Sequence, residues 1–233
     1  IPVPEFATLD ARVRLRRDTP RSTAQNATPI TIGPELVSPW WASPVSGALH
    51  AGSQASLALD ADGTPRVAWF DEAGGHLKLA TRIQGDWVQE SVDPAVGAGT
   101  YASLALDARG EPHLSYHDGV EFDLRHAWRS GDHWTIETVD APGVVGTYTS
   151  LALDAAGEPH ISYHDATQFD LKYAFRSHGV WTVESVDASG LVGMYTSLAL
   201  DAAGRPRIAY YDVGNGALKF ASRETGGWTL TTV

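Results

Sequence analysis

The chain has 233 residues, of which 43% are hydrophobic and 19% charged, a composition typical of a globular protein rather than a disordered one. Its net charge of −11 argues against nucleic acid or an anionic membrane surface as a partner, because both are recognised mainly by Lys and Arg. No apolar run approaches the ~18 residues of a membrane span, and the absence of cysteine excludes disulfides and Cys-ligated zinc.

The first 50 residues contain four candidate strands, at residues 5–9, 12–16, 28–32 and 35–41. Residues 12–21 are basic in an otherwise acidic chain, which is typical of an edge strand protected by charge. We interpret the segment as one diverged structural unit. The chain begins with Ile1 instead of Met, which would fit the removal of a signal peptide.

From residue 51 onward the sequence repeats. The run Ser-Leu-Ala-Leu-Asp begins at Ser56 and returns at Ser103, Ser150 and Ser197, each time 47 residues later. Such a period indicates one supersecondary unit copied in tandem, with each copy burying its apolar face against the next.

The third copy shows how one unit is built. Alternating or apolar runs at 150–154, 160–165, 171–176 and 181–186 predict four strands, separated by turns that contain Gly157 and Gly179. Four strands with three short links form an antiparallel meander. The longest link, 187–196, is where a β-propeller chain crosses from the outer strand of one blade to the inner strand of the next.

Several positions are shared by all copies and suit the scaffold. A glycine at Gly157 allows the positive φ that a hairpin turn requires, and Pro159 starts the second strand, where its missing N–H does least harm. A tryptophan opens the fourth strand of every copy, and we expect it at the seam between blades. These residues are Trp87, Trp134, Trp181 and Trp228.

Five units of 47 residues would make 235, close to the length of the chain. We therefore expect one all-β domain, a five-bladed β-propeller of four-stranded antiparallel blades. The blades would be 1–50 (the diverged first blade), 51–97, 98–144, 145–191 and 192–233. A ring of four blades with an N-terminal extension is the alternative.

Each copy carries Leu-x-Leu-Asp-x-x-Gly-x-Pro followed by an alternating strand that ends in Asp, as from Leu151 to Asp165. This pattern resembles the NHL and Asp-box-type repeats of bacterial β-propellers, although the Asp-box consensus itself is absent. The period and blade number are similar to those of the tachylectin-2-like five-bladed lectins. The resemblance implies a propeller, but no sugar-binding motif of those lectins can be matched here residue by residue.

Strand direction decides which loops lie together. The links between units and the loops between second and third strands share one side, which we call the crossover rim (the D–A and B–C loops, if the strands of a unit are lettered A to D). The two other turns of each unit form the hairpin rim. Aromatic and polar side chains gather at the crossover rim, so we place a ligand there. The predicted binding residues are Tyr101, Tyr148, Tyr195, His117, Asp118, Phe122, Asp123, His164, Asp165, Phe169, Asp170, Trp40 and Trp41.

The copies differ at this rim. An Asp ends the second strand of every copy, as at Asp118 and Asp165, which is typical of a carboxylate that caps its own loop. The His before it, the following Phe and a second Asp occur together only in the two middle copies. Their absence elsewhere favours either a function or a recent duplication of one unit.

Flat aromatic faces combined with planar carboxylates are the groups that bind sugars. We therefore predict a non-enzymatic, lectin-like recognition module of a bacterial protein, secreted or located in the periplasm or at the cell surface, with a glycan or a protein as partner. A scaffold subunit of a larger complex is the alternative. The oligomeric state stays open.

Enzyme signatures are absent from the sequence: it has no Gly-x-Ser-x-Gly, His-Glu-x-x-His or phosphate-loop motif. A metal-dependent or glycoside hydrolase is the less favoured reading. No cofactor is expected, although His beside carboxylates could ligate a divalent cation. The candidate ligands are His117, Asp123, His164 and Asp170, whose spacing matches no established metal signature.

Overall fold

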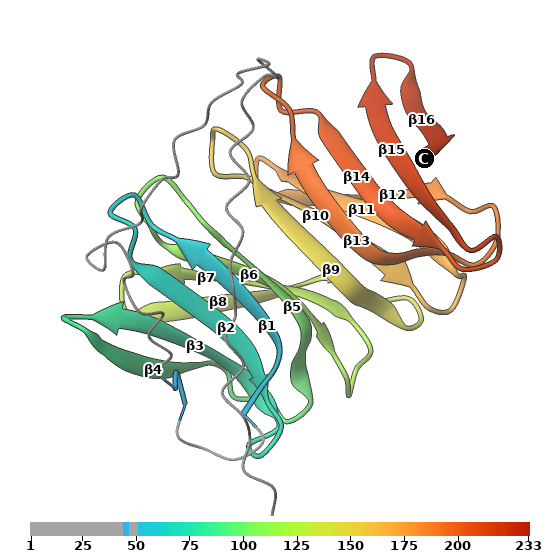
Figure 1. Ribbon diagram of the computed structural model, residues 1–233. Helices are drawn as coiled ribbons and strands as arrows, with labels where there is room; N and C mark the ends of the chain where they lie inside the picture. Colours follow the sequence, from blue (N-terminus) through green and yellow to red (C-terminus); the bar gives the residue numbers. More distant parts are fainter. Residues whose placement is uncertain (1–43, 47–50) are drawn as a thin grey trace, which may run out of the picture. The chain divides into compact units, whose positions relative to one another are not determined.

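The computed structural model describes residues 44–46 and 51–233, all of which lie in one compact unit, Ser43–Val233 (Figure 1). These residues form sixteen β-strands and no helix. The described part of the chain therefore contains no helix that could cross a membrane. The strands make four antiparallel sheets, each of four consecutive strands hydrogen-bonded in sequence order.

The four sheets correspond to the four sequence repeats. The first comprises β1 (Ala51–Leu59), β2 (Pro65–Asp71), β3 (His76–Ile83) and β4 (Asp86–Asp93). The second comprises β5 (Ala98–Leu106), β6 (Pro112–Asp118), β7 (Leu124–Ser130) and β8 (His133–Asp140). The third comprises β9 (Val145–Leu153), β10 (Pro159–Asp165), β11 (Asp170–Ser177) and β12 (Val180–Asp187). The fourth comprises β13 (Val192–Leu200), β14 (Pro206–Asp212), β15 (Ala217–Glu224) and β16 (Gly227–Thr232).

The expected number of five blades is wrong: the described residues form four, which we number blades 1 to 4 in chain order. The fifth was to come from residues 1–50, nearly all of which lie outside the described residues. That segment has the length of a repeat but lacks its run of Leu-Ala-Leu-Asp with the following turn Gly and Pro. Length alone therefore suggested a unit that the residue pattern did not support.

The hairpin between the first and second strands of each blade is built as its residues predict. In blade 3, Asp154 Oδ1 accepts hydrogen bonds from the backbone N–H groups of Ala156 (2.8 Å) and Glu158 (2.9 Å). Gly157 has a φ of +81°, a conformation that costs a side-chain-bearing residue energy. Equivalent aspartates cap the same turn in the other three blades.

The first strand of each blade begins earlier than the sequence suggested. In blade 3, β9 starts at Val145, not at Ser150, and the link from β12 to β13 spans only residues 188–191. The extra length contains a bulge, because the pairing register of β9 with β10 shifts between Ser162 and His164. The bulge brings residues that looked like loop into the inner strand.

The hydrophobic core lies at the seams between consecutive blades. Three buried clusters join blades 1 and 2, 2 and 3, and 3 and 4. Gly146 shows how closely the blades approach, since a Cβ added there would lie 2.8 Å from the Cα of Leu124 in the preceding blade. Only glycine fits this contact, and its φ of +88° also favours glycine.

Each seam is also closed by a buried polar contact. The hydroxyls of Tyr116, Tyr163 and Tyr210 donate to an aspartate that ends the preceding blade, at 2.6–2.7 Å. These acceptors are Asp93, Asp140 and Asp187. The tryptophans of the fourth strand lie at the seams as expected, since the Nε1 of Trp134, Trp181 and Trp228 donates to a glutamate of the preceding blade.

The two end blades each keep one face that no other described blade covers. Leu57 of blade 1 is 61% exposed, whereas its counterpart Leu104 in blade 2 is 7% exposed. Leu218 of blade 4 is 50% exposed, whereas Leu171 in blade 3 is fully buried. The repeat thus supplies the same apolar positions throughout, and the neighbouring blade decides whether they are buried.

Candidate functional site

Three tyrosines lie at the bulge of successive inner strands. Tyr101, Tyr148 and Tyr195 have φ values of 56°, 54° and 54°, a left-handed conformation that is costly for a bulky residue. Neighbouring blades hold this backbone in place: Thr149 Oγ1 donates to the carbonyl of Tyr101 at 3.2 Å, and Thr196 Oγ1 to that of Tyr148 at 2.8 Å.

The three tyrosine rings form a continuous row, which we call the tyrosine ladder. The ring centroids of Tyr101 and Tyr148 are 4.7 Å apart, and those of Tyr148 and Tyr195 are 4.5 Å apart, with interplanar angles of 53° and 55°. Gln54 occupies the same position in blade 1 with a φ of 55°, and its side-chain oxygen accepts a hydrogen bond from the N–H of Tyr101. The ladder therefore runs along the inner strands of blades 2, 3 and 4, and Gln54 of blade 1 continues its backbone conformation.

The ladder is open to solvent at one end. Tyr195 is 66% exposed, whereas Tyr101 and Tyr148 are half-buried by their neighbours. Burial, together with hydrogen bonding to Tyr195 and the closeness of Tyr101, raises the pKa of Tyr148 to about 12. The phenol stays neutral at physiological pH and can both donate and accept hydrogen bonds.

The two predicted histidines lie beside the ladder but face inward. The ring centroids of Tyr101 and His117 are 6.3 Å apart, and those of Tyr148 and His164 are 6.2 Å apart. His117 Nδ1 is 2.8 Å from the carbonyl of Val145, and His164 Nδ1 is 2.9 Å from that of Val192, both in the next blade. These histidines are buried, with 7% and 2% of their surfaces exposed. They connect neighbouring blades and lie next to the tyrosine rings.

The two aspartates that end the second strands are also bound within the scaffold. Asp118 Oδ1 accepts from the N–H of Val120 at 2.9 Å, and Asp165 Oδ1 from that of Thr167 at 2.9 Å. Their second oxygens pair with Arg125 at 2.7 Å and with Lys172 at 3.0 Å. Asp118 and Asp165 therefore cap their own loops, the role that their presence in every copy suggested.

The remaining predicted residues of the middle copies lie in the loops of the crossover rim. Phe122 and Phe169 are 47% and 45% exposed and have positive φ values of 64° and 62°. Burial raises the pKa of Asp123, while Asp170 accepts a hydrogen bond from the hydroxyl of Ser185 at 2.9 Å. Of these four residues, the two phenylalanines are aromatic, and both are exposed.

Trp40 and Trp41, the other two predicted residues, lie outside the described residues. The cation candidates do not converge. In the part of the chain that the structure describes, no three His, Asp or Glu side chains come together as a metal site requires. The candidate site is thus an aromatic one, with the tyrosine ladder at its centre.

Sequence reasoning missed a cavity on the opposite, hairpin rim, between blades 3 and 4. It is lined by residues such as Phe175, Arg205 and Glu224. One signal was available in the repeat: Arg205 stands where blade 3 has Glu158, and Glu224 stands where it has Ser177.

Four antiparallel blades joined by seams place the chain among proteins of the β-propeller class. No family of known domains and no curated protein matches the sequence. Solved structures do match: a Dyadobacter fermentans protein of unknown function has 10% identity and a TM-score of 0.58, over 77% of this chain and 64% of that one.

Two further matches are carbohydrate-binding proteins. The Aleuria aurantia lectin, solved with Fucα1-6GlcNAc, has 15% identity and a TM-score of 0.54 over 80% of this chain and 64% of that one. An exo-β-1,3-galactanase from Phanerochaete chrysosporium has 11% identity and a TM-score of 0.55 over 83% and 52%. This chain thus spans about half to two thirds of the length of the three structures, and identities this low show the fold alone.

Proposed function

We propose that this protein is a non-enzymatic glycan-binding module, and that the tyrosine ladder with the flanking loops of the crossover rim is its binding surface. The observation that carries the proposal is the ladder itself. Tyr101, Tyr148 and Tyr195 all hold an unfavourable backbone conformation. Glycine or asparagine would adopt it at lower cost, which points to a role for the aromatic side chains.

The ladder suits sugars on chemical grounds. The C–H face of a pyranose packs on an aromatic ring, and the phenol hydroxyls can pair with sugar hydroxyls. Successive rings 4.5–4.7 Å apart form a continuous strip, so the surface fits a chain of sugar units better than a compact ligand. Phe122 and Phe169 add exposed aromatic surface at the same rim. That the Aleuria lectin binds a fucosylated disaccharide supports the proposal by analogy.

The carboxylates of this rim favour binding over hydrolysis. Glycosidases require two carboxyl groups free to act on the scissile bond. Asp118 and Asp165 are 2% and 1% exposed, and each is held by loop amides and by a cation. Asp170 is bonded to Ser185. These three carboxylates hold the scaffold, which supports a binding role over hydrolysis.

The experiment compares wild type with Tyr148→Gln and Tyr195→Gln on a glycan array, followed by calorimetric titration of the best ligand. Glutamine is the matched replacement because Gln54 holds the same backbone conformation in blade 1. Loss of one stacking ring, worth about 1.5 kcal/mol, should weaken binding about tenfold. Tyr148→Phe, which keeps the ring, should retain most of the affinity.

Two results would contradict the proposal. An intact protein that binds no glycan would instead favour the scaffold subunit. Release of shortened saccharides during the titration would show a hydrolase. The proposed setting outside the cytoplasm, where glycans are displayed, is tested separately by fractionating the cells that produce the protein.

A further inference from the structure

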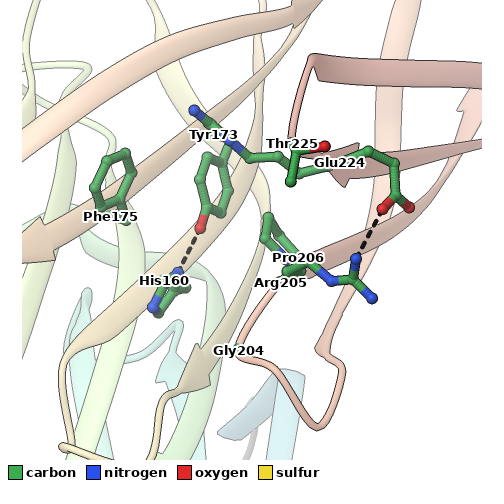
Figure 2. A pocket seen from close by; sticks show the side chains of 9 residues that line it. His160, Tyr173, Phe175, Gly204, Arg205, Pro206, Glu224 and Thr225 are labelled. Carbon is green, nitrogen blue, oxygen red and sulfur yellow. Dashed lines mark hydrogen bonds and ion pairs between the residues drawn. The ribbon is translucent and has the colours of Figure 1, made fainter.

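The cavity between blades 3 and 4 lies at the hairpin rim, on the opposite side of the blades from the tyrosine ladder. It has a volume of about 360 Å³ and sits between blades 3 and 4. Blade 3 contributes His160, Tyr173 and Phe175; blade 4 contributes the turn with Arg205 and Pro206, and Glu224 from the end of β15 (Figure 2).

The wall from blade 3 is aromatic and consists of the rings of His160, Tyr173 and Phe175. Phe175 is tilted by only 18° from the His160 ring and by 26° from the Tyr173 ring, with centroids 6.2 Å and 5.7 Å away. A hydrogen bond joins His160 Nδ1 to the Tyr173 hydroxyl and holds the two rings together (Figure 2). Burial lowers the pKa of His160, so the wall is uncharged at physiological pH.

The corresponding place between blades 2 and 3 is occupied by the chain's own side chains. There Trp128 stands in the position of Phe175, and the guanidinium of Arg176 lies 5.0 Å from the centre of its ring. The equivalent arginine of blade 4, Arg223, instead lies over Trp228 at 5.6 Å and pairs with Glu184. Phe175 is smaller than its counterpart Trp128. Because Arg223 lies over Trp228, Phe175 has no arginine over its ring as Trp128 has.

The edge of the cavity carries an Arg–Glu pair that blades 2 and 3 do not have at the equivalent positions. Arg205 Nη1 donates to Glu224 Oε2 at 2.9 Å, and Arg205 Nε donates to Asp201 Oδ2 at 2.8 Å. The Arg205 and Glu224 side chains are 46% and 43% exposed, so their outer edges can reach a ligand.

The arginines around the cavity are held in ion pairs. Arg205 and Arg207 both pair with Glu224 and Asp201, and Arg223 pairs with Glu184. Asp154 Oδ2 lies 3.9 Å from His160 Nε2 and adds a negative charge beside the aromatic wall. The cavity lining therefore offers no unpaired cation to attract a carboxylate. A ligand here gains from ring stacking and from neutral hydroxyl groups that bond to the guanidinium and carboxylate edges.

We propose that this cavity is a second glycan site, which binds the ring of a neutral pyranoside with its C–H face on Phe175 and its hydroxyls at the Arg205–Glu224 pair. The ligand class rests on the proposed function, whereas the site is independent of the ladder. With sites on both rims, one copy of the chain could bind two glycan branches at once, which increases avidity without any additional contact.

The test titrates methyl glycosides of neutral hexoses and 6-deoxyhexoses, with a methyl uronide as the charged control, and follows aromatic ring protons by NMR. The key variant is Phe175→Trp. It places at the seam between blades 3 and 4 the residue that Trp128 provides between blades 2 and 3, so the variant should fold. It should abolish the ligand-induced shifts of the Tyr173 ring and leave any binding at the ladder unchanged. Glu224→Ser, the residue of blade 3, should weaken binding at the cavity about tenfold by loss of a charge-assisted hydrogen bond.

Tyr148→Gln separates the two sites, because it should weaken binding at the ladder and leave the shifts at the cavity as in wild type. The second site is refuted if no neutral pyranoside shifts the Tyr173 ring of folded wild-type protein, or if Phe175→Trp binds every probe as wild type does. It is also refuted if the uronide binds at the cavity more tightly than the neutral glycosides. Failure of the ladder alone would appear as Tyr148→Gln binding like wild type, with Phe175→Trp losing all binding.

Discussion

The seam contacts predict an unequal response to the same substitution in two blades. Tyr163→Phe removes a hydroxyl that donates to Asp140 at 2.6 Å, and Tyr116→Phe removes one that donates to Asp93 at 2.7 Å. Both tyrosines are fully buried, and phenylalanine fills the same space. The change in the free energy of unfolding therefore measures the lost hydrogen bond and depends on which other partners the carboxylate keeps.

The two carboxylates keep different partners. Asp140 Oδ2 retains the ammonium of Lys172 at 3.0 Å, whereas the nearest cation to Asp93 Oδ2 is Arg125 at 3.8 Å, beyond hydrogen-bond distance. A hydrogen bond to a charged group contributes about 1.5–3 kcal/mol, and a buried acceptor left unsatisfied adds to the loss. We expect a loss of about 1.5 kcal/mol for Tyr163→Phe and about 3 kcal/mol for Tyr116→Phe.

Urea unfolding followed by tryptophan fluorescence measures both values, with the slope of the transition checked for each variant. Leu230→Ala, a change at a partly exposed position of the last strand, controls for unspecific loosening. Equal losses in the two tyrosine variants, or a larger loss for Tyr163→Phe, would refute the role assigned to the remaining cation.

Three further predictions concern the seams and their ionisable groups. Gly146→Ala should destabilise the fold by more than 3 kcal/mol, because the added Cβ would lie 2.8 Å from backbone. In the control Gly157→Ala the added Cβ would have nothing within 4 Å, so the positive φ should cost only about 1 kcal/mol. Equal losses of stability in urea unfolding would contradict this prediction. Burial opposes ionisation of Asp187, but the ammonium of Lys219 and further hydrogen bonds hold its pKa at about 2, below the ordinary 3.8. The resulting stability, about 2 kcal/mol, is present above pH ~4 and should be lost between pH ~4 and ~2; Asp187→Asn should flatten that part of the pH profile. Burial lowers the pKa of His113 to about 4, so the unfolded chain binds more protons and stability should fall as the pH drops from ~6.5 to ~4; an unchanged slope in His113→Asn would count against this.

The repeat made most of the fold predictable. Four strands per unit, the capped hairpin at Asp154 and Gly157, and the tryptophans at the seams all follow from local rules of alternation, turn chemistry and burial. Each of these features depends on residues close together in the sequence or on contacts between equivalent repeat units. It can therefore be predicted from one copy and checked in the next. The blade count failed where the repeat stops, because the length of residues 1–50 says nothing about how they pair.

The candidate site was predicted only in part. The sequence placed its candidate residues, the three tyrosines among them, at the crossover rim. It assigned Tyr148 to a loop, whereas a bulge places it in β9. His117 and His164 looked like ligand-binding residues, yet both bond to the next blade. A side chain that varies among repeats can still be structural if its partner belongs to another blade.

The sequence by itself determined the unit, its strands and the positions that every blade requires, because these depend on short-range periodicity and turn geometry. Only the tertiary structure decided what each varying side chain faces. Trp128 and Phe175 occupy equivalent positions, but one is covered by Arg176 while the other lines a cavity. The difference arises where two blades meet, since the partner there comes from a different copy and its orientation is set by the packing of the whole seam.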